Sequence, residues 1–90
     1  MNLKRIVIRK VVERKILRKH RLTFGDVHDA LMYGNPVIFK MRNNLYIAIS
    51  KFMKYLTIIF KYEDGNTVVK TAYQSSGWQK KLYERKQKTR

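Results

Sequence analysis

The residues best suited to chemistry in this sequence are cations that alternate with aromatic side chains. They comprise Lys40 and Arg42 ahead of Tyr46, then Lys51, Lys54 and Lys61 around Tyr55, and finally Tyr73, Trp78, Lys80, Lys81, Tyr83 and Arg85. Lysine and arginine contact phosphate groups, and aromatic rings stack on exposed bases. The pattern therefore predicts a surface that binds a phosphate chain carrying bases.

The charge of the whole chain supports the same interpretation. The 90 residues include 21 Lys+Arg against 6 Asp+Glu, for a formal net charge of +15. Hyperthermophile proteins are also rich in lysine, but they normally carry matching glutamate, which is missing here. Self-repulsion of this size favours a polyanionic partner, RNA rather than DNA in our interpretation. Two basic segments, Arg9 to Arg21 and Lys80 to Arg90, suit a cleft or a face that follows a phosphate chain.

Several reaction classes lack the residues they need. The chain has no cysteine, which excludes disulfides, cysteine-ligated zinc and thiol catalysis. Its four glycines stand alone, and His28 and Asp29 point in different directions on a predicted helix. We therefore expect neither a metal ion nor a cofactor. A metal-independent reaction on phosphate esters remains, in which cations stabilise developing charge and Tyr, Lys or His carries a proton.

The apolar segments predict a cytoplasmic protein that does not enter a membrane. The runs from Ile6 to Ile8 and from Leu56 to Phe60 are far too short to span a bilayer. The amino terminus lacks the apolar stretch of a signal peptide. A basic helix could lie on an anionic membrane, but Val11 to His20 has too few apolar residues to anchor well.

Two helices are expected near the amino terminus, after a short strand from Ile6 to Ile8. Val12 and Ile16 recur at helical spacing, which predicts a helix from Val11 to about His20 to Leu22. Thr23 is a predicted N-cap for the second helix, with Asp26 in its first turn. The apolar stripe of that helix is Phe24, Val27 and Leu31. Gly34 fits the residue just beyond the helix, and Asn35-Pro36 prevents continuation.

Four antiparallel strands and a last helix are expected in the remainder. The first strand starts at Val37, and Arg42 to Asn44 forms a turn. Leu45 to Ser50 and Tyr55 to Tyr62 alternate as half-buried strands, joined by Lys51 to Lys54. Leu56, Ile58 and Phe60 share one face of the second of these; Tyr55, Thr57, Ile59 and Lys61 share the other. In strand Leu45 to Ser50, the alternation places Leu45, Ile47 and Ile49 on the apolar face.

The Asp64-Gly65 hairpin leads into the strand from Thr67 to Tyr73. Ser75 or Ser76 caps a basic helix from about Gly77 to Arg85, and residues 86–90 form a frayed basic tail. Helices and strands that are segregated along the chain predict an α+β fold. We see one domain, residues 1–90, with two helices packed on an antiparallel meander and a terminal basic helix.

Plain structural roles are the alternatives for several residues. Tyr55 and Tyr62 are expected to pack on the sheet, and Trp78 to dock the last helix on it. His20 either satisfies carbonyls at a helix end or takes part in function. Lys70 is predicted on the same strand face as Val68 and Ala72, with its amine reaching solvent at an edge.

The run from Lys15 to Phe24, KILRKHRLTF, resembles the "KHG-(V/I)-(S/T)-F" segment of BrnT-type toxins. That family belongs to the RelE/ParE superfamily of toxin–antitoxin systems. Arg21 stands where the family has glycine. The strands Tyr46 to Ile49 and Leu56 to Phe60 are similar to successive strands of the family. Val69 to Tyr73 takes the place of its last strand, which often ends "I-S-A-R", and Trp78 to Arg85 resembles its terminal helix in content. The similarity in element order covers most of the chain.

This resemblance implies a compact RelE-like toxin that cleaves mRNA without metal and is held inactive by an acidic antitoxin. Tyr73 takes the position of the last-strand arginine, with Lys51, Lys54 and Lys61 as nearby cations and Tyr83 or Arg85 as the group from the terminal helix. Tyrosine can transfer a proton, but it lacks the bidentate phosphate contact of arginine.

We therefore assign candidate catalytic and binding residues from sequence. The catalytic set is Lys51, Lys54, Lys61, Tyr73, Tyr83 and Arg85; the nucleic-acid-binding set is Arg18, Lys19, His20, Lys40, Arg42, Lys80 and Lys81. The leading hypothesis is a metal-independent endoribonuclease. The alternatives are a non-enzymatic nucleic-acid-binding protein of a virus or mobile element with a related fold, and a subunit whose basic helices meet an acidic protein.

Overall fold

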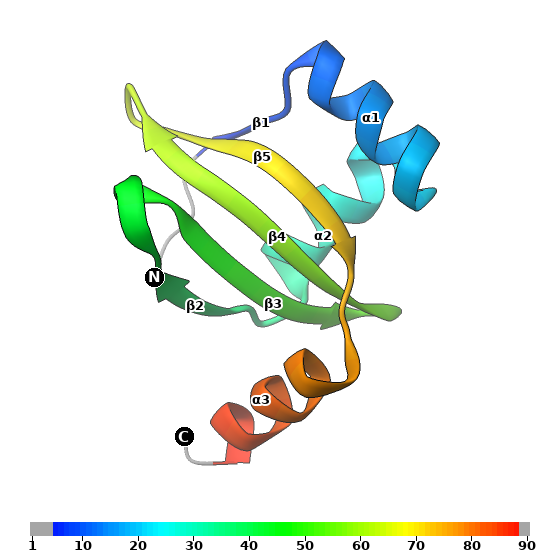
Figure 1. Cartoon of the computed structure of the whole chain (residues 1–90), viewed down its shortest axis with the longest axis vertical. Helices are drawn as coiled ribbons and strands as arrows, with labels where there is room; N and C mark the ends of the chain where they lie inside the picture. The colour runs from blue at the N-terminus through cyan, green and yellow to red at the C-terminus, as the bar shows by residue number, and fades with distance from the viewer. Residues whose placement is uncertain (1–4, 89–90) are drawn as a thin grey trace.

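A five-stranded sheet forms the centre of the structure (Figure 1), a computed structural model that describes residues 5–88. Its strands are β1 (Ile6–Val7), β2 (Val37–Lys40), β3 (Tyr46–Phe52), β4 (Lys54–Glu63) and β5 (Asn66–Gln74). Strands β2 to β5 form an antiparallel meander. The short β1 pairs in parallel with β5, so the order is β1-β5-β4-β3-β2. The predicted α+β class and meander are confirmed.

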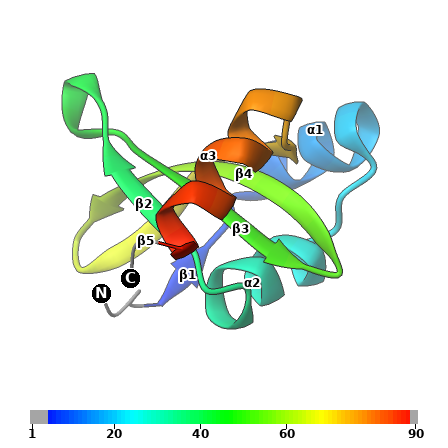
Figure 2. The same cartoon turned by 90° about the horizontal axis from the view of Figure 1, so that it is seen from below.

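The helices are α1 (Lys10–His20), α2 (Phe24–Tyr33) and α3 (Gly77–Lys88). Helix α2 lies against one face of the sheet and α3 against the other, while α1 runs beside β5 (Figures 1 and 2). Helix α3 continues to Lys88, beyond the end predicted at Arg85. The rest of the predicted frayed tail, residues 89 and 90, lies outside the described residues. No helix within residues 5–88 is long and apolar enough to cross a membrane.

The core lies between the sheet and helices α1 and α2. Its buried residues are Ile16, Leu22, Val27, Ala30, Leu31, Ala48, Leu56, Ile58, Phe60, Val69 and Ala72. Leu56, Ile58 and Phe60 point into it together, because alternate residues of a strand share a face. On β3, Ala48 rather than Ile47 faces this core. The prediction that Leu45, Ile47 and Ile49 supply the inner face of that strand is therefore wrong for this layer; Ile49 is buried outside this cluster.

The local signals for the chain reversals are confirmed. Thr23 accepts a hydrogen bond from the Asp26 amide, and the Asp26 carboxylate accepts one from the Thr23 amide, which completes a capping box. The hairpin between β4 and β5 has positive φ at Asp64 and Gly65, as an Asp-Gly turn requires. The expected connection from Lys51 to Lys54 is shorter than predicted, because β3 and β4 pair up to Phe52 and Lys54.

Gly34 ends α2 with a negative φ of −87°, and the left-handed conformation is taken by Asn35 at φ 50°. The helix therefore ends just before Gly34, as predicted, and the left-handed turn residue is Asn35. A Cβ at Gly34 would lie 2.4 Å from the Ala30 carbonyl oxygen and 3.0 Å from Ser50 Cβ. Glycine is thus needed here for the close approach of α2 to β3. Phe24, predicted as part of the apolar stripe of α2, remains 39% exposed.

Helix α3 docks through Gln79 and Tyr83, both buried, one helical turn apart. The Tyr83 ring packs edge-on against Tyr55, and its hydroxyl donates to the Gly34 carbonyl at 3.0 Å. Trp78 is 63% exposed, so the prediction that it docks the helix is wrong. The reason is geometric: once Gln79 and Tyr83 face the sheet, a side chain one residue earlier points about 100° away from it. The predicted packing of Tyr62 on the sheet is confirmed by its ring contacts with Tyr46 and Phe60, whereas the ring of Tyr55 packs against Tyr83 of α3.

A β-bulge in β5 decides which way Lys70 points. The pairing of β4 with β5 shifts between Ile59 and Phe60, so that Val69 and Ala72, three residues apart, both face the core. The prediction that Lys70, Val68 and Ala72 share one face is therefore wrong. Lys70 instead approaches Glu63 and α1.

Candidate functional site

A basic hollow of about 190 Å³ lies between α1 and β5. It is lined by Val12, Lys15, Ile16, Lys19, His20, Lys70 and Thr71. Helix α1 supplies these cations because Val12 and Ile16 turn towards the protein, which brings Lys15 and Lys19 to the rim. We call this feature the α1–β5 groove.

His20 occupies the end of the groove because α1 stops immediately after it. Arg21 takes the left-handed conformation, with φ 58°, and its amide donates to the Leu17 carbonyl. The sequence resemblance has glycine at this position, and the geometry shows why glycine suits it. The His20 ring lies 6.0 Å from the ring of Tyr73 between centroids. An imidazole and a phenol, both half-buried, are thereby placed side by side from two distant segments.

Gln79 of α3 holds the Tyr73 hydroxyl. The Gln79 Oε1 accepts hydrogen bonds from the Ser76 amide at 2.8 Å and from Thr57 Oγ1 at 3.0 Å. These two donors fix the orientation of the Gln79 amide, so Nε2 donates to the Tyr73 oxygen at 3.1 Å. Because that oxygen is the acceptor, the phenol keeps its own hydrogen to donate to another group.

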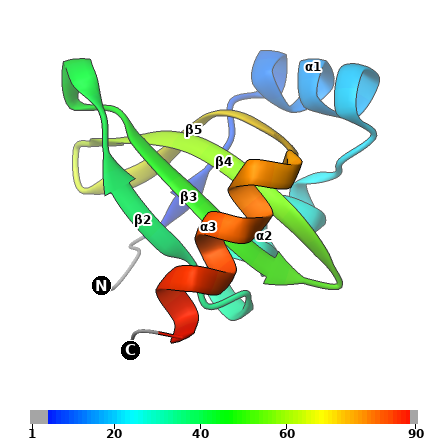
Figure 3. The same cartoon turned by 60° about the horizontal axis from the view of Figure 1, so that its bottom comes forward.

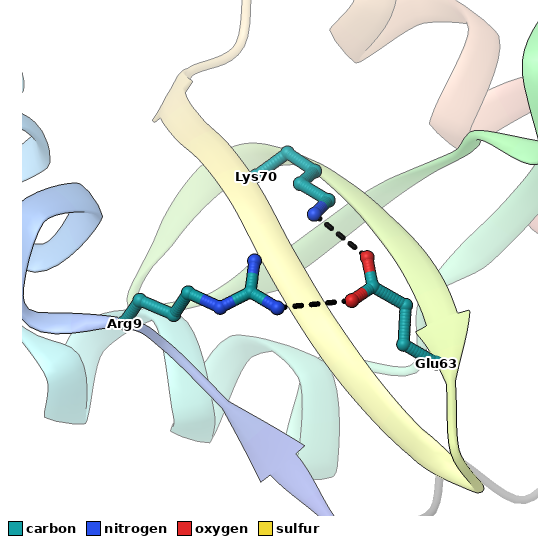
Figure 4. A network of polar contacts seen from close by, with 3 residues as sticks. All are labelled: Arg9, Glu63 and Lys70. Atoms are coloured by element: carbon teal, nitrogen blue, oxygen red, sulfur yellow. Dashed lines mark hydrogen bonds and ion pairs between the residues drawn. The ribbon is translucent and has the colours of Figure 1, made fainter.

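The acid nearest to the groove cations is Glu63, shown with its partners in Figure 4. Its carboxylate contacts Lys70 at 2.7 Å and Arg9 at 3.0 Å. The hydrogen bonds from Lys70 and Arg9 lower the pKa of Glu63 below its usual value. This half-buried acid therefore stays charged and partly offsets Lys70. Within residues 5–88, Lys15 and Lys19 form no ion pair, and they remain free to bind an anion.

The predicted site residues fall into several places. Lys19, His20 and Tyr73 meet at the groove, with Arg18 exposed on the same helix. Lys61 shares the α3-facing side of β4, four residues and roughly 13 Å along the strand from Thr57, the partner of Tyr73. Lys40 and Arg42 lie at the β2–β3 connection, on the far side of β3 and β4 from β5.

A second group surrounds Tyr55. The amines of Lys51 and Lys80 lie 5.0 and 5.6 Å from the centre of its ring. A hydrogen bond with Tyr55 is the main cause of the raised pKa of Lys51. Lys54 is exposed at the adjoining β3–β4 turn. This group lies on the α3 face of the sheet. Ile49 pairs with Thr57, which pairs with Tyr73, and Lys51 lies two residues farther along β3 than Ile49.

The structure gives Tyr83 and Arg85 different surroundings. The Tyr83 hydroxyl reaches the carbonyls of Gly34 and Asn35 at 3.0 and 3.3 Å, which ties α3 to the end of α2. Arg85 is exposed and lines a shallow hollow on the outside of α3, with Lys80, Lys81, Glu84 and Lys88. The described partners of the Tyr73 side chain are His20 and Gln79, and neither Tyr83 nor Arg85 is among them. Their catalytic roles remain sequence-based predictions.

Three residues of the site were missed by sequence reasoning: Gln79, Lys15 and Lys70. Gln79 had a usable signal, because Ser76 and Gln79 have the spacing of a capping box, but its bond to Tyr73 depends on tertiary packing. Lys15 and Lys70 had no such sequence signal. The place of Lys15 depends on how α1 docks beside β5, and the direction of Lys70 depends on the β-bulge in β5. In the described part of the chain, no three His, Asp or Glu side chains gather as ligands for a metal ion.

The groove combines unpaired cations with two proton-carrying side chains. Such an arrangement can bind a phosphate group and move protons beside it. On this geometry the chain is a small basic α+β protein with a candidate phosphodiester-binding groove.

The chain has the fold of a bacterial ribonuclease toxin. It is similar to the crystal structure of the Brucella abortus ribonuclease toxin BrnT, with a TM-score of 0.67 and 20% sequence identity. The similarity covers 83% of this chain and 99% of that chain. No protein-family model and no curated protein matches the sequence. The expected BrnT-like fold is thus confirmed, and at this identity the likeness concerns the fold alone.

Proposed function

We propose that this protein is a BrnT-like toxin of the RelE/ParE superfamily that cleaves RNA in the cytoplasm without a metal ion. The observation that carries the proposal is the pairing of His20 with Tyr73 beside the unpaired lysines of the α1–β5 groove. The fold shared with a ribonuclease toxin supports it. The formal charge of +15 supports an RNA substrate and an acidic antitoxin as partners.

The reaction that suits these groups is an internal transfer at phosphorus. The 2′-oxygen of a ribose attacks the adjacent phosphorus and loses its proton to the His20 imidazole, which acts as general base. The bond from phosphorus to the 5′-oxygen breaks, and Tyr73 donates its proton to that oxygen. The products are a 2′,3′-cyclic phosphate and a 5′-hydroxyl, so the step consumes no water.

The surrounding residues have supporting roles in this scheme. Lys15 and Lys19 bind the phosphate oxygens and stabilise the charge that develops on them. Gln79 holds the Tyr73 oxygen by its Nε2 hydrogen bond, so that the phenol hydrogen points away from α3. Lys61 lies farther along the same face and would contact a neighbouring phosphate.

The test is cleavage of a labelled single-stranded RNA by the pure protein in EDTA. We expect Tyr73→Phe and His20→Asn each to slow cleavage by about a hundredfold, because each removes a proton carrier. Tyr33→Phe and His28→Asn make the same changes on α2, outside the groove, and are expected to keep the parent rate. A matched strand with 2′-deoxyribose should stay intact.

A non-enzymatic nucleic-acid-binding protein is the second candidate. The family that the sequence resembles has arginine at the position of Tyr73. Tyrosine lacks the bidentate phosphate contact of arginine, which favours a protein that binds RNA without cleaving it. Tight, salt-sensitive binding of RNA that remains intact with the pure protein would contradict the nuclease proposal for the free chain. The same assay repeated with ribosomes would then separate a binding protein from a ribosome-dependent enzyme.

A further inference from the structure

The outer face of α3 carries an exposed tryptophan in line with cations. Trp78 is 63% exposed and contacts no aromatic ring or hydrogen-bond partner within residues 5–88. Lys81 and Arg85 follow at i+3 and i+7, spacings that share one face of a helix. Both are exposed. At 1.5 Å per residue, the stripe from Trp78 to Arg85 is about 10 Å long.

The charge of this face is strongly positive. Helix α3 contains Lys80, Lys81, Arg85, Lys86 and Lys88 against a single acid, Glu84. Glu84 accepts a hydrogen bond from the Tyr55 hydroxyl, so this acid is engaged by the sheet. The helix lies across the sheet as the outermost element of its layer (Figure 3). Its outer face is therefore open to a polyanion.

The stripe begins at the end of α3 that is joined to Tyr73, the aromatic neighbour of His20 in the α1–β5 groove. Trp78 precedes Gln79, whose Nε2 donates to the Tyr73 hydroxyl at 3.1 Å. A strand bound with one phosphate beside Tyr73 would therefore pass the first turn of α3. Stacking on an exposed indole is available to every base, and the cations that follow can hold the phosphates beyond it.

We propose that Trp78, Lys81 and Arg85 form a binding surface for single-stranded RNA that continues from the groove. A base stacks on the Trp78 indole, while Lys81 and Arg85 contact the phosphates next to it. The inference rests on the proposed function, since RNA is the substrate assumed for the groove. It adds where the flanking nucleotides bind and which side chain holds them.

The sequence provides its own probe, because Trp78 is the one tryptophan of the chain. We would titrate the protein with a 2′-O-methyl RNA of about 12 nucleotides, which cannot be cleaved by 2′-oxygen attack. Stacking is expected to quench the tryptophan fluorescence. Inorganic polyphosphate of matched charge should compete for the surface without quenching, because it has no bases.

Substitutions then measure what Trp78 contributes. We expect Trp78→Ala to weaken binding of the same oligonucleotide about tenfold by fluorescence anisotropy. Tyr33→Ala removes an aromatic ring of similar exposure from α2 and should leave the affinity unchanged. Trp78 is 63% exposed and stands outside the buried core, so the variant is expected to fold, which circular dichroism checks. Leu82→Ala, on the same helix, separates an effect of helix packing from one of the exposed ring.

Several outcomes would overturn the proposal. Binding without quenching, equal quenching by polyphosphate, or an unchanged affinity of Trp78→Ala would each do so. Quenching by poly-glutamate but not by the oligonucleotide would assign the face to an acidic protein instead. Failure of the proposed function looks different: the RNA would stay intact with the parent protein while the oligonucleotide still quenches Trp78.

Discussion

Gln79 shows how one side chain links the candidate chemistry to the fold. It is buried, and it bonds at once to Ser76, Thr57 and Tyr73. An amide is well suited to this place, because its oxygen accepts from two donors while its nitrogen donates to the phenol. We therefore regard Gln79 as a positioning residue for Tyr73.

Replacement of Gln79 by leucine tests this role. We expect Gln79→Leu to lower the free energy of unfolding by about 1–3 kcal/mol, because buried donors lose their acceptor. RNA cleavage per folded molecule should fall by about tenfold. The double variant with Tyr73→Phe should be no slower than Tyr73→Phe alone, since both changes act through one phenol. Rates in denaturant-free buffer and chemical unfolding curves measure both effects.

The matched control is Tyr55→Phe. It removes a different hydrogen bond between the sheet and α3, the one from Tyr55 to Glu84, and leaves Tyr73 untouched. If Tyr55→Phe slowed cleavage as much as Gln79→Leu, the effect would belong to the docking of α3 in general. Independent losses in the double variant would also remove the positioning role.

At the scale of elements, the end of α1 decides where His20 lies. Arg21 adopts φ 58°, a conformation that costs an ordinary residue roughly 1–2 kcal/mol. The chain accepts this cost because the turn sends Leu22 into the core, where it is fully buried. The capping box at Thr23 then starts α2 immediately.

This geometry predicts that Arg21→Gly stabilises the protein. We expect the free energy of unfolding to rise by about 1 kcal/mol, because glycine adopts the left-handed conformation without the steric cost. Thermal unfolding followed by circular dichroism measures it. The matched control is Arg18→Gly, which removes the same charge but lies inside α1 and should lower stability by about 1 kcal/mol. Equal effects of the two variants would show that charge, rather than backbone conformation, dominates.

At the scale of the whole molecule, lysine and arginine occur in every helix and strand except β1 and α2. Arg9 and Lys70 both pair with the same acid, Glu63, and the sequence has only 6 Asp+Glu for its 21 Lys+Arg. Most lysines and arginines therefore keep their charge uncompensated, which favours a polyanionic partner. The two parts of the proposed contact surface are linked through Tyr73, whose ring neighbours His20 and whose hydroxyl is bonded to Gln79 of α3.

The affinity for RNA should accordingly depend steeply on salt. If Lys15, Lys19, Lys61, Lys81 and Arg85 contact phosphates, a plot of log affinity against log salt concentration has a slope of about −3.5 for a single strand. Lys19→Gln and Lys81→Gln should each reduce its magnitude by about 0.7. We expect Arg42→Gln, at the far side of the sheet, to leave the slope unchanged. A reduction by Arg42→Gln would extend the contact to the β2–β3 connection, and a flat plot would contradict polyanion binding.

The sequence by itself determined the features that depend on near neighbours. The capping box of Thr23 and Asp26, the Asp64-Gly65 hairpin and the alternating faces of β4 all match their predictions, because each arises from residues within a few positions. The α+β class followed from the order of these elements. The basic composition indicates a polyanionic partner without reference to the fold, because net charge depends only on which residues are present.

Only the tertiary structure decided which side chains meet. His20 and Tyr73 are 53 residues apart in the sequence and come together because α1 docks beside β5. Lys70 points to Glu63 because of a bulge that the alternating pattern does not reveal. Trp78 is exposed because Gln79 and Tyr83 take the inner face of α3. These outcomes depend on packing between distant segments, and local propensity and periodicity carry no information about such packing.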